Sequence, residues 1–287
     1  MLRMVEIDEP QAGPGQIRIA VRSAGVNQKD WKIRAGHLRD FHPLVLPAGL
    51  GMDASGVVDQ VAADVEGVAA GDAVFGMGTN TYSQYALLDE WAKMPAGLSF
   101  TEAAGYPLAV ETAIRILRSV GLKAGELLLV NGASGGVGSA VLQFARDRGI
   151  KVIGTAGLSN QEYLRSLGAT PTTYGEGLVD RVCSLAPDGV HAALDLAGSG
   201  IIPDLVKLTG DAQKVLSIAD FTAPEYGARV SSEPENPSAA LAEAAQKFSQ
   251  GSFSIHLVQS FPLEQVSLAH IMSAQGHARG RLVLDIG

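Results

Sequence analysis

Cysteine is almost absent from this 287-residue sequence, since Cys183 is its single cysteine and no internal disulfide can form. A chain without disulfides suits a reducing compartment, and we expect a cytoplasmic protein. No apolar run reaches the roughly 18 residues of a membrane-spanning helix, and the first ten residues lack the features of a signal peptide. Positive charge is also scarce: 22 Lys and Arg against 30 Asp and Glu give a net charge of −8, which disfavours nucleic acid and anionic membranes as partners.

The pattern of the chain changes near residue 101, which indicates two domains. Before it, short alternating segments separated by Gly-Asp turns predict a barrel-like β unit. After residue 126, strands alternate with helices, which is typical of a parallel sheet. The last strands resemble the start of the chain, so we expect the tail to return to the first domain. The predicted strands are 16–24, 56–61, 73–77, 82–88, 126–132, 151–156, 170–174, 190–197, 213–219, 228–231, 253–261 and 281–286; the predicted helices begin near Thr101, as N-cap, and at 109–120, 136–148, 160–167, 178–185, 200–208, 238–250 and 263–274.

A glycine-rich turn between a strand and a helix is the most informative feature. The apolar run Leu127–Val130 is followed by Asn131, Gly132, Ala133, Ser134, Gly135, Gly136, Val137 and Gly138. Glycines allow the backbone to approach a pyrophosphate, and the following helix N-terminus offers N–H groups and a partial positive charge. Because the flanking strand, helix and second strand are all present, the turn predicts dinucleotide binding.

One competing motif overlaps this turn. The residues from Gly132 to Gly136 also fit G-x-S-x-G, the nucleophile elbow of hydrolases, and Asp195 with His256 or His270 would follow in a suitable order. Against a hydrolase, Gly138 extends the glycine pattern into the helix, and no oxyanion segment of the HGGG type precedes the turn. We therefore favour the dinucleotide interpretation.

The end of the second strand of this unit carries no acidic residue until Glu162. NAD enzymes usually place Asp or Glu there to bind the ribose hydroxyls, and such an acid would repel a 2′-phosphate. Its absence favours NADPH as the cofactor, although an NAD enzyme that uses other groups stays open.

At this point the sequence resembles the medium-chain dehydrogenase/reductase superfamily, in its zinc-free, quinone oxidoreductase-like branch. The resemblance rests on the glycine turn and on the motifs G-V-N-x-x-D-x-x-x-R-x-G at 25–36, G-D-x-V-x-G at 71–76, Pro107-Leu108-Ala109, Thr112-Ala113 and the terminal 276–281. It implies an α/β protein with a Rossmann doubly wound parallel sheet (108–252), a GroES-like β-barrel substrate domain (1–107 and 253–287) and an active site in the cleft between them.

Two departures from the family pattern concern the barrel edge and the phosphate site. Relatives have a longer N-terminus that forms the first hairpin; here Met1 falls where that hairpin should return, so either the chain is shortened or its edge is built differently. An uncovered edge strand invites association. In the loop after the second Rossmann strand, Gly157 and Ser159 stand where related NADPH enzymes often have Ser and Arg.

The resemblance also implies which residues bind the cofactor. Asn27 and Thr112 should lie near the nicotinamide, Tyr174 near the adenosine phosphate, and Arg279 should assist from the C-terminus. The remaining implied cofactor-binding residues are Ser134, Gly135, Gly136, Val137, Gly138, Ala156, Gly157, Ser159, Asn160, Leu196, Ala197, Gly198, Ser217, Ile218 and Ala219.

The sequence lacks the ligands of a catalytic zinc. Such a site needs three protein ligands, but the corresponding positions hold Asn27, Met52 and the cysteine-free stretch 103–113. Without a Lewis acid, alcohol oxidation is disfavoured. Hydride delivery to a quinone or enone needs only positioning, hydrogen-bond donors and a proton.

Three residues are candidates for that chemistry. They are Asn27, which the resemblance places near the nicotinamide, Lys32 and Tyr85. Lys32, Tyr85 or water could supply the proton, and the alternatives are a solvated lysine and a tyrosine that packs in the barrel. We expect Asp30 and Arg34 to form a structural ion pair or turn anchor, and Asp53 to be structural or functional.

The sequence thus predicts an NADPH-dependent reductase of quinones or α,β-unsaturated carbonyls, acting on a small molecule and forming a homodimer through the last Rossmann strand, near 228–232. Two alternatives remain. One is an enoyl reductase or cyclase of a natural-product pathway, and the other is a non-redox NADPH-binding relative of the same fold.

Overall fold

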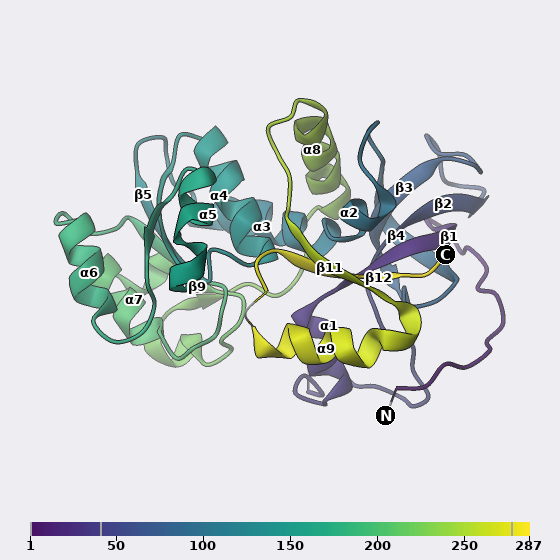
Figure 1. The fold of residues 1–287 in the computed structure, drawn as a ribbon, viewed down its shortest axis with the longest axis horizontal. Coiled ribbons are helices and arrows are strands. Elements are labelled where there is room, and N and C mark those ends of the chain that lie inside the picture. The colour runs from purple at the N-terminus through teal and green to yellow at the C-terminus, as the bar shows by residue number, and fades with distance from the viewer. Residues whose placement is uncertain (1, 41, 277) are drawn as a thin grey trace. The chain divides into compact units, whose positions relative to one another are not determined.

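The computed structural model describes residues 2–40, 42–276 and 278–287. The chain forms two compact units (Figure 1). Unit 1 comprises the described residues up to Glu111 together with Asn236–Gly287, and unit 2 is Thr112–Glu235. The boundary differs from the expected one: residues 108–111 and 236–252, predicted to belong to the Rossmann domain, group with unit 1. No helix of the described residues is both long and apolar enough to cross a membrane.

Unit 1 is built on a six-stranded sheet with the order β11-β12-β1-β2-β3-β4. An additional pairing of β1 with β4 closes the first four strands into a barrel. The neighbouring strands of this sheet are antiparallel except β11 and β12, which are parallel. Because β12 pairs with β1, the tail of the chain lies in the same sheet as its first strand. The strands are β1 (Ile17–Val26), β2 (Asp53–Val61), β3 (Ala73–Thr79), β4 (Tyr85–Lys93), β11 (Leu257–Pro262) and β12 (Arg281–Asp285).

The alternation of β1 explains the barrel core. Ile17, Ile19 and Val21 are buried and pack with apolar side chains of the other strands, whereas Arg18 and Arg22 point the other way. A strand exposes alternate residues on opposite faces, so the sequence period sets which face enters the core.

Short helices complete unit 1: α1 (Gln28–Arg34), α2 (Phe100–Ala104), α8 (Pro237–Ser249) and α9 (Val266–Gln275), with a 3-10 turn at Leu263–Gln265. The predicted N-cap Thr101 is wrong, because Ser99 caps α2: its Oγ accepts from the N–H of Glu102 at 3.2 Å. Ser99 and Glu102 form a capping box. Helix α8 packs against β4, where Ser238 donates its N–H to Glu90 at 3.1 Å, which explains why it groups with unit 1.

Unit 2 is a parallel sheet with the order β10-β9-β8-β5-β6-β7. This is the doubly wound order, in which the order of the parallel strands reverses between β5 and β8. The strands are β5 (Leu127–Asn131), β6 (Lys151–Thr155), β7 (Thr170–Thr172), β8 (Ala192–Asp195), β9 (Val215–Ser217) and β10 (Arg229–Val230). The helices are α4 (Gly136–Asp147), α5 (Gln161–Ser166), α6 (Leu178–Leu185) and α7 (Ile202–Thr209); α3 (Pro107–Val120) begins in unit 1 and ends in unit 2, and 3-10 turns lie at Leu158–Asn160, Ala212–Lys214 and Ala223–Tyr226.

Several predicted strands end earlier than expected. The strands predicted at 190–197 and 213–219 stop at Asp195 and Ser217. The reason is visible in the side chains, because both residues accept hydrogen bonds from the backbone that follows them and turn it out of the sheet. In the tail, β11 starts at Leu257 rather than at 253.

Candidate active site

The glycine-rich turn connects β5 to α4 as the sequence predicted. Gly132 has a φ of +83°, which favours glycine. At Gly138 a Cβ atom would lie 2.5 Å from the carbonyl oxygens of both Gly132 and Ala133, so the helix packs against the turn too closely for any side chain. Gly135 is the N-cap and provides no side chain to the first turn of α4. Uncapped N–H groups at a helix start are available to an external acceptor.

The loop after β6 lies beside this turn. Asn160 Nδ2 donates to Ser134 Oγ at 3.5 Å, and the hydroxyl of Tyr174 lies 3.7 Å from the Cβ position of Gly157. Ser159 is exposed on the same short segment. The structure therefore places Asn160 beside Ser134 and Tyr174 beside Gly157.

Two residues that the sequence did not single out shape this loop. Gln161 Nε2 donates to the carbonyl oxygens of Ala156 at 2.8 Å and Thr172 at 3.2 Å, which joins the ends of β6 and β7. Arg181 Nη2 donates to the carbonyl oxygens of Thr173 at 3.0 Å and Tyr174 at 3.3 Å. No local pattern distinguishes these side chains from ordinary helix residues.

A buried hydrogen-bond network joins the carboxyl ends of β5, β6, β8 and β9. The Asp195 carboxylate accepts from Asn131 Nδ2 at 3.0 Å and from Ser217 Oγ at 2.8 Å. Thr155 Oγ1 donates to Asn131 Oδ1 at 2.7 Å and accepts from the N–H of Gly132 at 3.2 Å. We call Asn131, Thr155, Asp195 and Ser217 the strand-end network.

The strand-end network fixes the two loops predicted to flank the nicotinamide. Asp195 Oδ1 accepts from the N–H groups of Ala197 at 3.1 Å and Gly198 at 3.0 Å. Ser217 Oγ accepts from the N–H groups of Ala219 at 3.1 Å and Asp220 at 2.9 Å. The loops also touch, since a Cβ on Gly198 would lie 2.9 Å from the carbonyl oxygen of Ala219. The two loops, 196–198 and 217–219, are thus neighbours. The Ser217 hydroxyl is used in hydrogen bonds that hold these loops in place.

This network argues against the hydrolase alternative. Asp195 is fully buried and its carboxylate is taken up by Asn131, Ser217 and the backbone. Within the described part of the chain, the side chain that contacts the Ser134 hydroxyl is the Asn160 amide and not a histidine. The arrangement of a Ser-His-Asp triad needs a histidine between the other two.

Thr112 lies buried on α3 and contacts a second buried side chain. Arg115 Nη2 donates to Thr112 Oγ1 at 3.5 Å, and Arg115 Nη1 donates to Ser231 Oγ. Arg115 therefore links α3 to the segment that follows β10.

In unit 1, Asn27 lies at the end of β1 within a buried polar cluster. Asn27 Nδ2 donates to Asp53 Oδ2 at 3.0 Å, and Arg281 Nη2 donates to Asn27 Oδ1 at 2.7 Å and to Asp53 Oδ2 at 3.1 Å. Asp53 also accepts from the N–H of Leu108 at 3.2 Å. Burial raises the pKa of Asp53, while the Arg281 guanidinium opposes this increase. We call Asn27, Asp53 and Arg281 the Asn27 cluster.

Asp30 anchors the turn at the start of α1. Its Oδ2 accepts from the N–H of Asn27 at 2.8 Å and from the hydroxyl of Tyr82 at 2.8 Å. Tyr82 in turn lies 3.4 Å from Nε2 of His270 on α9. Burial raises the pKa of Asp30 to about 7 and lowers that of His270 to about 4. The turn-anchor role expected of Asp30 is what the structure shows.

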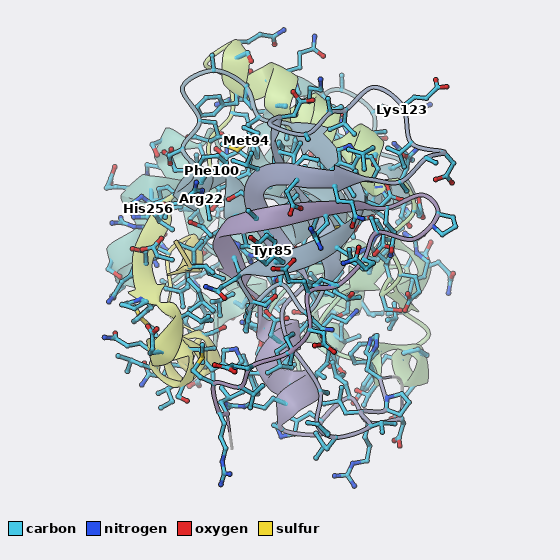
Figure 2. All side chains as sticks on the ribbon, turned by 90° about the vertical axis from the view of Figure 1, so that its right-hand side faces the viewer. Arg22, Tyr85, Met94, Phe100, Lys123 and His256 are labelled. Carbon is cyan, nitrogen blue, oxygen red and sulfur yellow. The ribbon has the colours of Figure 1, made fainter. Side chains whose placement is uncertain are left out.

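The predicted proton donors are not brought to one place. Tyr85 pairs with Ala20 on β1, and its ring lies 5.3 Å from the Arg18 guanidinium carbon on the outer sheet face (Figure 2). Asn27 comes seven residues after Ala20 in the chain, roughly 23 Å along the strand at about 3.3 Å per residue. The tyrosine that reaches the Asn27 region is Tyr82, because its segment precedes β4. Lys32 is half-buried on α1, with Nζ 5.8 Å from the Trp31 ring, and Arg279 is exposed just before β12.

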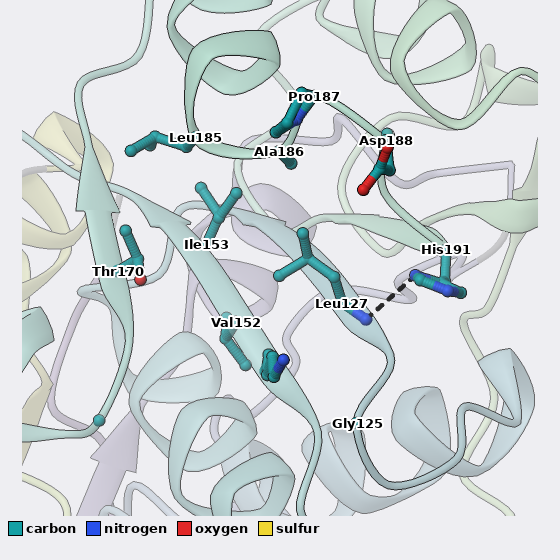
Figure 3. Close-up of a pocket in the computed structure, with 13 residues that line it drawn as sticks. Gly125, Leu127, Val152, Ile153, Thr170, Leu185, Ala186, Pro187, Asp188 and His191 are labelled. Carbon is teal, nitrogen blue, oxygen red and sulfur yellow. Dashed lines mark hydrogen bonds between the residues drawn. The ribbon is translucent and has the colours of Figure 1, made fainter.

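Two further observations delimit the site. Within the described residues, no group of three or more His, Cys, Asp or Glu side chains is arranged to hold a metal ion. A pocket of about 450 Å³ lies at the opposite, N-terminal ends of the unit 2 strands, lined by Leu127, Lys151, Thr170 and His191 among others (Figure 3). Ligands of open parallel sheets bind at the carboxyl ends, so this pocket is not the candidate site.

Known proteins match both units. Residues 13–105 match the family model "Alcohol dehydrogenase GroES-like domain", and residues 136–230 match the model "Zinc-binding dehydrogenase". The chain is 33% identical over 299 residues to the spectinabilin polyketide synthase system protein NorB of Streptomyces orinoci, an alignment that covers 95% of this chain and 13% of that protein. It is 42% identical over 147 residues to the quinone oxidoreductase of Sus scrofa, covering 50% and 44% of the two chains.

The chain therefore spans less than half the length of these two curated relatives. Among solved structures, the quinone oxidoreductase from Coxiella burnetii superposes with a TM-score of 0.85 at 27% identity, covering 99% of this chain and 95% of that one. The two family models match one after the other along the chain, the first on the barrel and the second on the doubly wound sheet. The chain therefore belongs to the medium-chain dehydrogenase/reductase family, in its quinone oxidoreductase-like branch.

Proposed function

We propose that this protein is an oxidoreductase that uses NADPH to reduce a quinone or an α,β-unsaturated carbonyl without zinc. The observation that carries the proposal is the turn between β5 and α4. Gly138 leaves no room for a side chain there, and Gly135 leaves the first turn of α4 uncapped. A pyrophosphate fits such a cradle because it accepts hydrogen bonds and carries negative charge.

The preference for NADPH over NADH rests on the loop after β6. Neither Asp nor Glu occurs between Thr155 and Gln161, and the 3-10 turn there starts at Gly157 without a side-chain cap. The N–H groups and the Ser159 hydroxyl would hold a 2′-phosphate, with the exposed Tyr174 ring beside it. No basic side chain lies in this loop, so we expect a moderate preference. Arg279 remains a proposed helper.

For the chemistry, NADPH when bound supplies a hydride to an electron-poor carbon of the acceptor. Loops 196–198 and 217–219, with Thr112, would hold the nicotinamide end, because the strand-end network fixes both loops. Asn27 would donate a hydrogen bond from Nδ2 to the acceptor oxygen as negative charge develops on it. The proton would come from Lys32 or from water, because Tyr85 lies beside Arg18 on the outer sheet face.

The donors around Asn27 also support chemistry without zinc. An amide and the guanidinium of Arg281 lie at this point of the barrel, with Met52 directly before Asp53 in the chain. Zinc sites use thiolate, imidazole or carboxylate ligands, and the carboxylate of this cluster, Asp53, is engaged by Asn27, Leu108 and Arg281. The Asn27 amide would instead offer a hydrogen bond to a developing oxyanion, while the Arg281 guanidinium balances the charge of Asp53.

The direct test has two arms. Calorimetric titration with NADPH and NADH measures binding, and we expect NADPH to bind more tightly. Loss of the absorbance of reduced nicotinamide, followed with a panel of quinones and enones, measures turnover. Binding without oxidation of NADPH by any acceptor would support the non-redox alternative, and neither binding nor turnover would refute the proposal.

A second candidate function follows from the alignment with NorB, which covers 95% of this chain but 13% of that synthase component. Because that relative is named a polyketide synthase system protein, we propose as the second candidate an enoyl reductase of a natural-product pathway, with an enoyl thioester as its acceptor. Adding an enoyl thioester to the same panel separates the candidates, since a preference of at least about tenfold in kcat/KM would correspond to about 1.4 kcal/mol of transition-state binding.

We also propose a homodimer through β10, which is the edge strand of the unit 2 sheet. An edge strand offers unpaired backbone groups to another copy. Sedimentation velocity would show a dimer, and a monomer at micromolar concentration would contradict it.

A further inference from the structure

The Asn27 cluster contains more than the donor that the proposed function uses. Asp53 is fully buried, and Asn27 and Arg281 are 1% and 9% exposed. Burying an ion pair costs desolvation free energy that apolar side chains at the same positions would not cost. Such a pair therefore calls for a role other than simple packing.

The first role is orientation of the Asn27 amide. Its oxygen accepts from Arg281 and its nitrogen donates to Asp53. A flipped amide would direct Nδ2 hydrogens at the guanidinium and Oδ1 at the carboxylate, and both contacts would be repulsive. The two charges thus hold one orientation. Of the two Nδ2 hydrogens, one is used by Asp53; among the described residues the other has no partner.

The second role is compensation of charge. The Asp53 carboxylate receives one hydrogen bond from Asn27, one from the backbone of Leu108 and an ion pair from Arg281 at 3.1 Å. If Arg281 were neutral, a buried negative charge would remain beside the amide. Any oxyanion that forms on the acceptor would then meet a like charge in surroundings of low dielectric constant.

The backbone makes room for Arg281. A Cβ on Gly105 would lie 3.2 Å from Cβ and 3.3 Å from Cγ of Arg281, so glycine at this position lets the arginine stem pass. Arg281 Nε is buried and has no hydrogen-bond partner in the described part of the chain. The arginine is thus kept in a costly position by its contacts with Asn27 and Asp53.

We propose that Arg281 is a positioning residue for the reduction: with Asp53 it fixes the Asn27 amide so that one Nδ2 hydrogen faces the acceptor oxygen, and it neutralises the carboxylate behind that amide. This inference rests on the proposed function. It also narrows the substrate class, because the arrangement favours acceptors on which an oxygen becomes negative and offers nothing to an acceptor without a carbonyl or quinone oxygen.

The test compares Arg281→Met, Asp53→Asn, the double variant and the matched control Arg22→Met. Arg22 is exposed on β1 and has no role in the proposal (Figure 2). We expect Arg281→Met to lower kcat by about 10- to 100-fold, less than the 10²- to 10³-fold that loss of an oxyanion donor costs. The NADPH dissociation constant should change little, since Arg281 contacts Asn27 and Asp53 and the proposed phosphate cradle lies in unit 2.

Charge compensation makes a prediction that a purely structural role does not. The double variant has no uncompensated carboxylate, so its kcat should exceed that of Arg281→Met by about fivefold or more, as for coupled neighbours. Additive losses would overturn the proposal, as would an unchanged kcat in a folded Arg281→Met. Arg281→Lys retains the charge and serves if the methionine variant does not fold; we expect its kcat to be intermediate.

A second measurement separates this inference from the proposed function. The side-chain amide of Asn27 gives a pair of NMR signals, and one protected hydrogen is expected for the Asp53 contact. In Arg281→Met the shift and the hydrogen-exchange protection of this pair should change, and in Arg22→Met they should not. Unchanged signals refute the positioning role even if the wild type turns over. Changed signals in a protein that reduces no acceptor support fixation of the amide, while the proposed function fails.

Discussion

Asp195 provides the sharpest test of how the fold supports the site. Its carboxylate lies at the centre of the strand-end network and accepts four hydrogen bonds at 2.8 to 3.1 Å, from Asn131, Ser217, Ala197 and Gly198. In Asp195→Ala all four donors lose their acceptor. Water can reach the exposed backbone of residues 197 and 198, so the loss concentrates on the buried Asn131 and Ser217. At about 1–3 kcal/mol for each buried unsatisfied group, we expect a destabilisation of roughly 4 kcal/mol.

Asp195→Asn should cost less, for a reason visible in the geometry. An asparagine oxygen at the Oδ1 position keeps the bonds from Asn131 and the two backbone N–H groups. Its nitrogen then faces Ser217 Oγ, which already accepts from two N–H groups. The serine hydrogen can turn to the main-chain oxygen of residue 195, 3.3 Å away. One poor contact replaces one good one, so we expect about 1–2 kcal/mol.

The assay is urea denaturation at fixed pH, with Asp188→Asn as the control, since Asp188 is an exposed aspartate of the same unit. Both tryptophans, Trp31 and Trp91, belong to unit 1. Far-UV circular dichroism should therefore shift more than tryptophan fluorescence. The control should stay within about 0.5 kcal/mol of the wild type. If Asp195→Ala unfolds at the same urea concentration as the control, the network does not stabilise unit 2 and our reasoning about the two loops fails.

Other substitutions test the turn and the buried titrating groups. Gly138→Ala should destabilise the protein by about 1–3 kcal/mol despite the helix propensity of alanine, because its Cβ would lie 2.5 Å from two carbonyl oxygens. At Gly135 the nearest atom lies 3.7 Å from the Cβ position. Gly135→Ala should therefore change the stability by about 1 kcal/mol or less and weaken NADPH binding, which calorimetry measures. Asp30 has a folded-state pKa of about 7 against 3.8, so its ionisation removes stability as the pH rises from 4 to 7. Asp30→Asn should therefore gain on the wild type over that range in urea denaturation and level off above it, and a constant difference contradicts this. His270, whose folded-state pKa is about 4 against 6.5, costs stability as the pH falls from 6.5 to 4; His270→Gln should gain on the wild type in that direction, and parallel pH curves would show that the histidine is not buried in its neutral form.

The elements of unit 2 were predictable because their signals are local. The limits predicted for α4 and α6 agree with the structure to within a residue, since glycines and apolar periodicity mark them directly. The N-cap of α2 also has a local signal, although Thr101 was the wrong residue for it. Ser99 and Glu102 already form the capping-box spacing in the sequence, whereas Thr101 lacks an acidic partner three residues later.

The outward position of Tyr85 is of a different kind, since the sequence held the information to predict it. Ala86 and Leu88 face the barrel core, so the two-residue period of the strand directs Tyr85 outward. Tyr82 could not be selected in the same way. It reaches Asp30 from a segment that precedes β4 and is held by a backbone bond to Leu50 at 3.0 Å, and neither contact leaves a local pattern.

The residues proposed to bind the phosphates contact neighbours that are near in the sequence, whereas Asn27, proposed for the chemistry, contacts a residue that is distant in the sequence. The predicted phosphate cradle and its loop come from one continuous stretch, so reading the sequence was enough to bring Ser134, Asn160 and Tyr174 together. The contact between Asn27 and Arg281 spans 254 residues, and closure of the barrel tail onto β1 is what creates it. A single sequence therefore predicts the geometry of the glycine turn well but leaves the surroundings of Asn27 open. Substitutions in β12 that shift its register with β1 should for the same reason alter kcat while leaving NADPH affinity unchanged, because they move Arg281 and leave unit 2 intact.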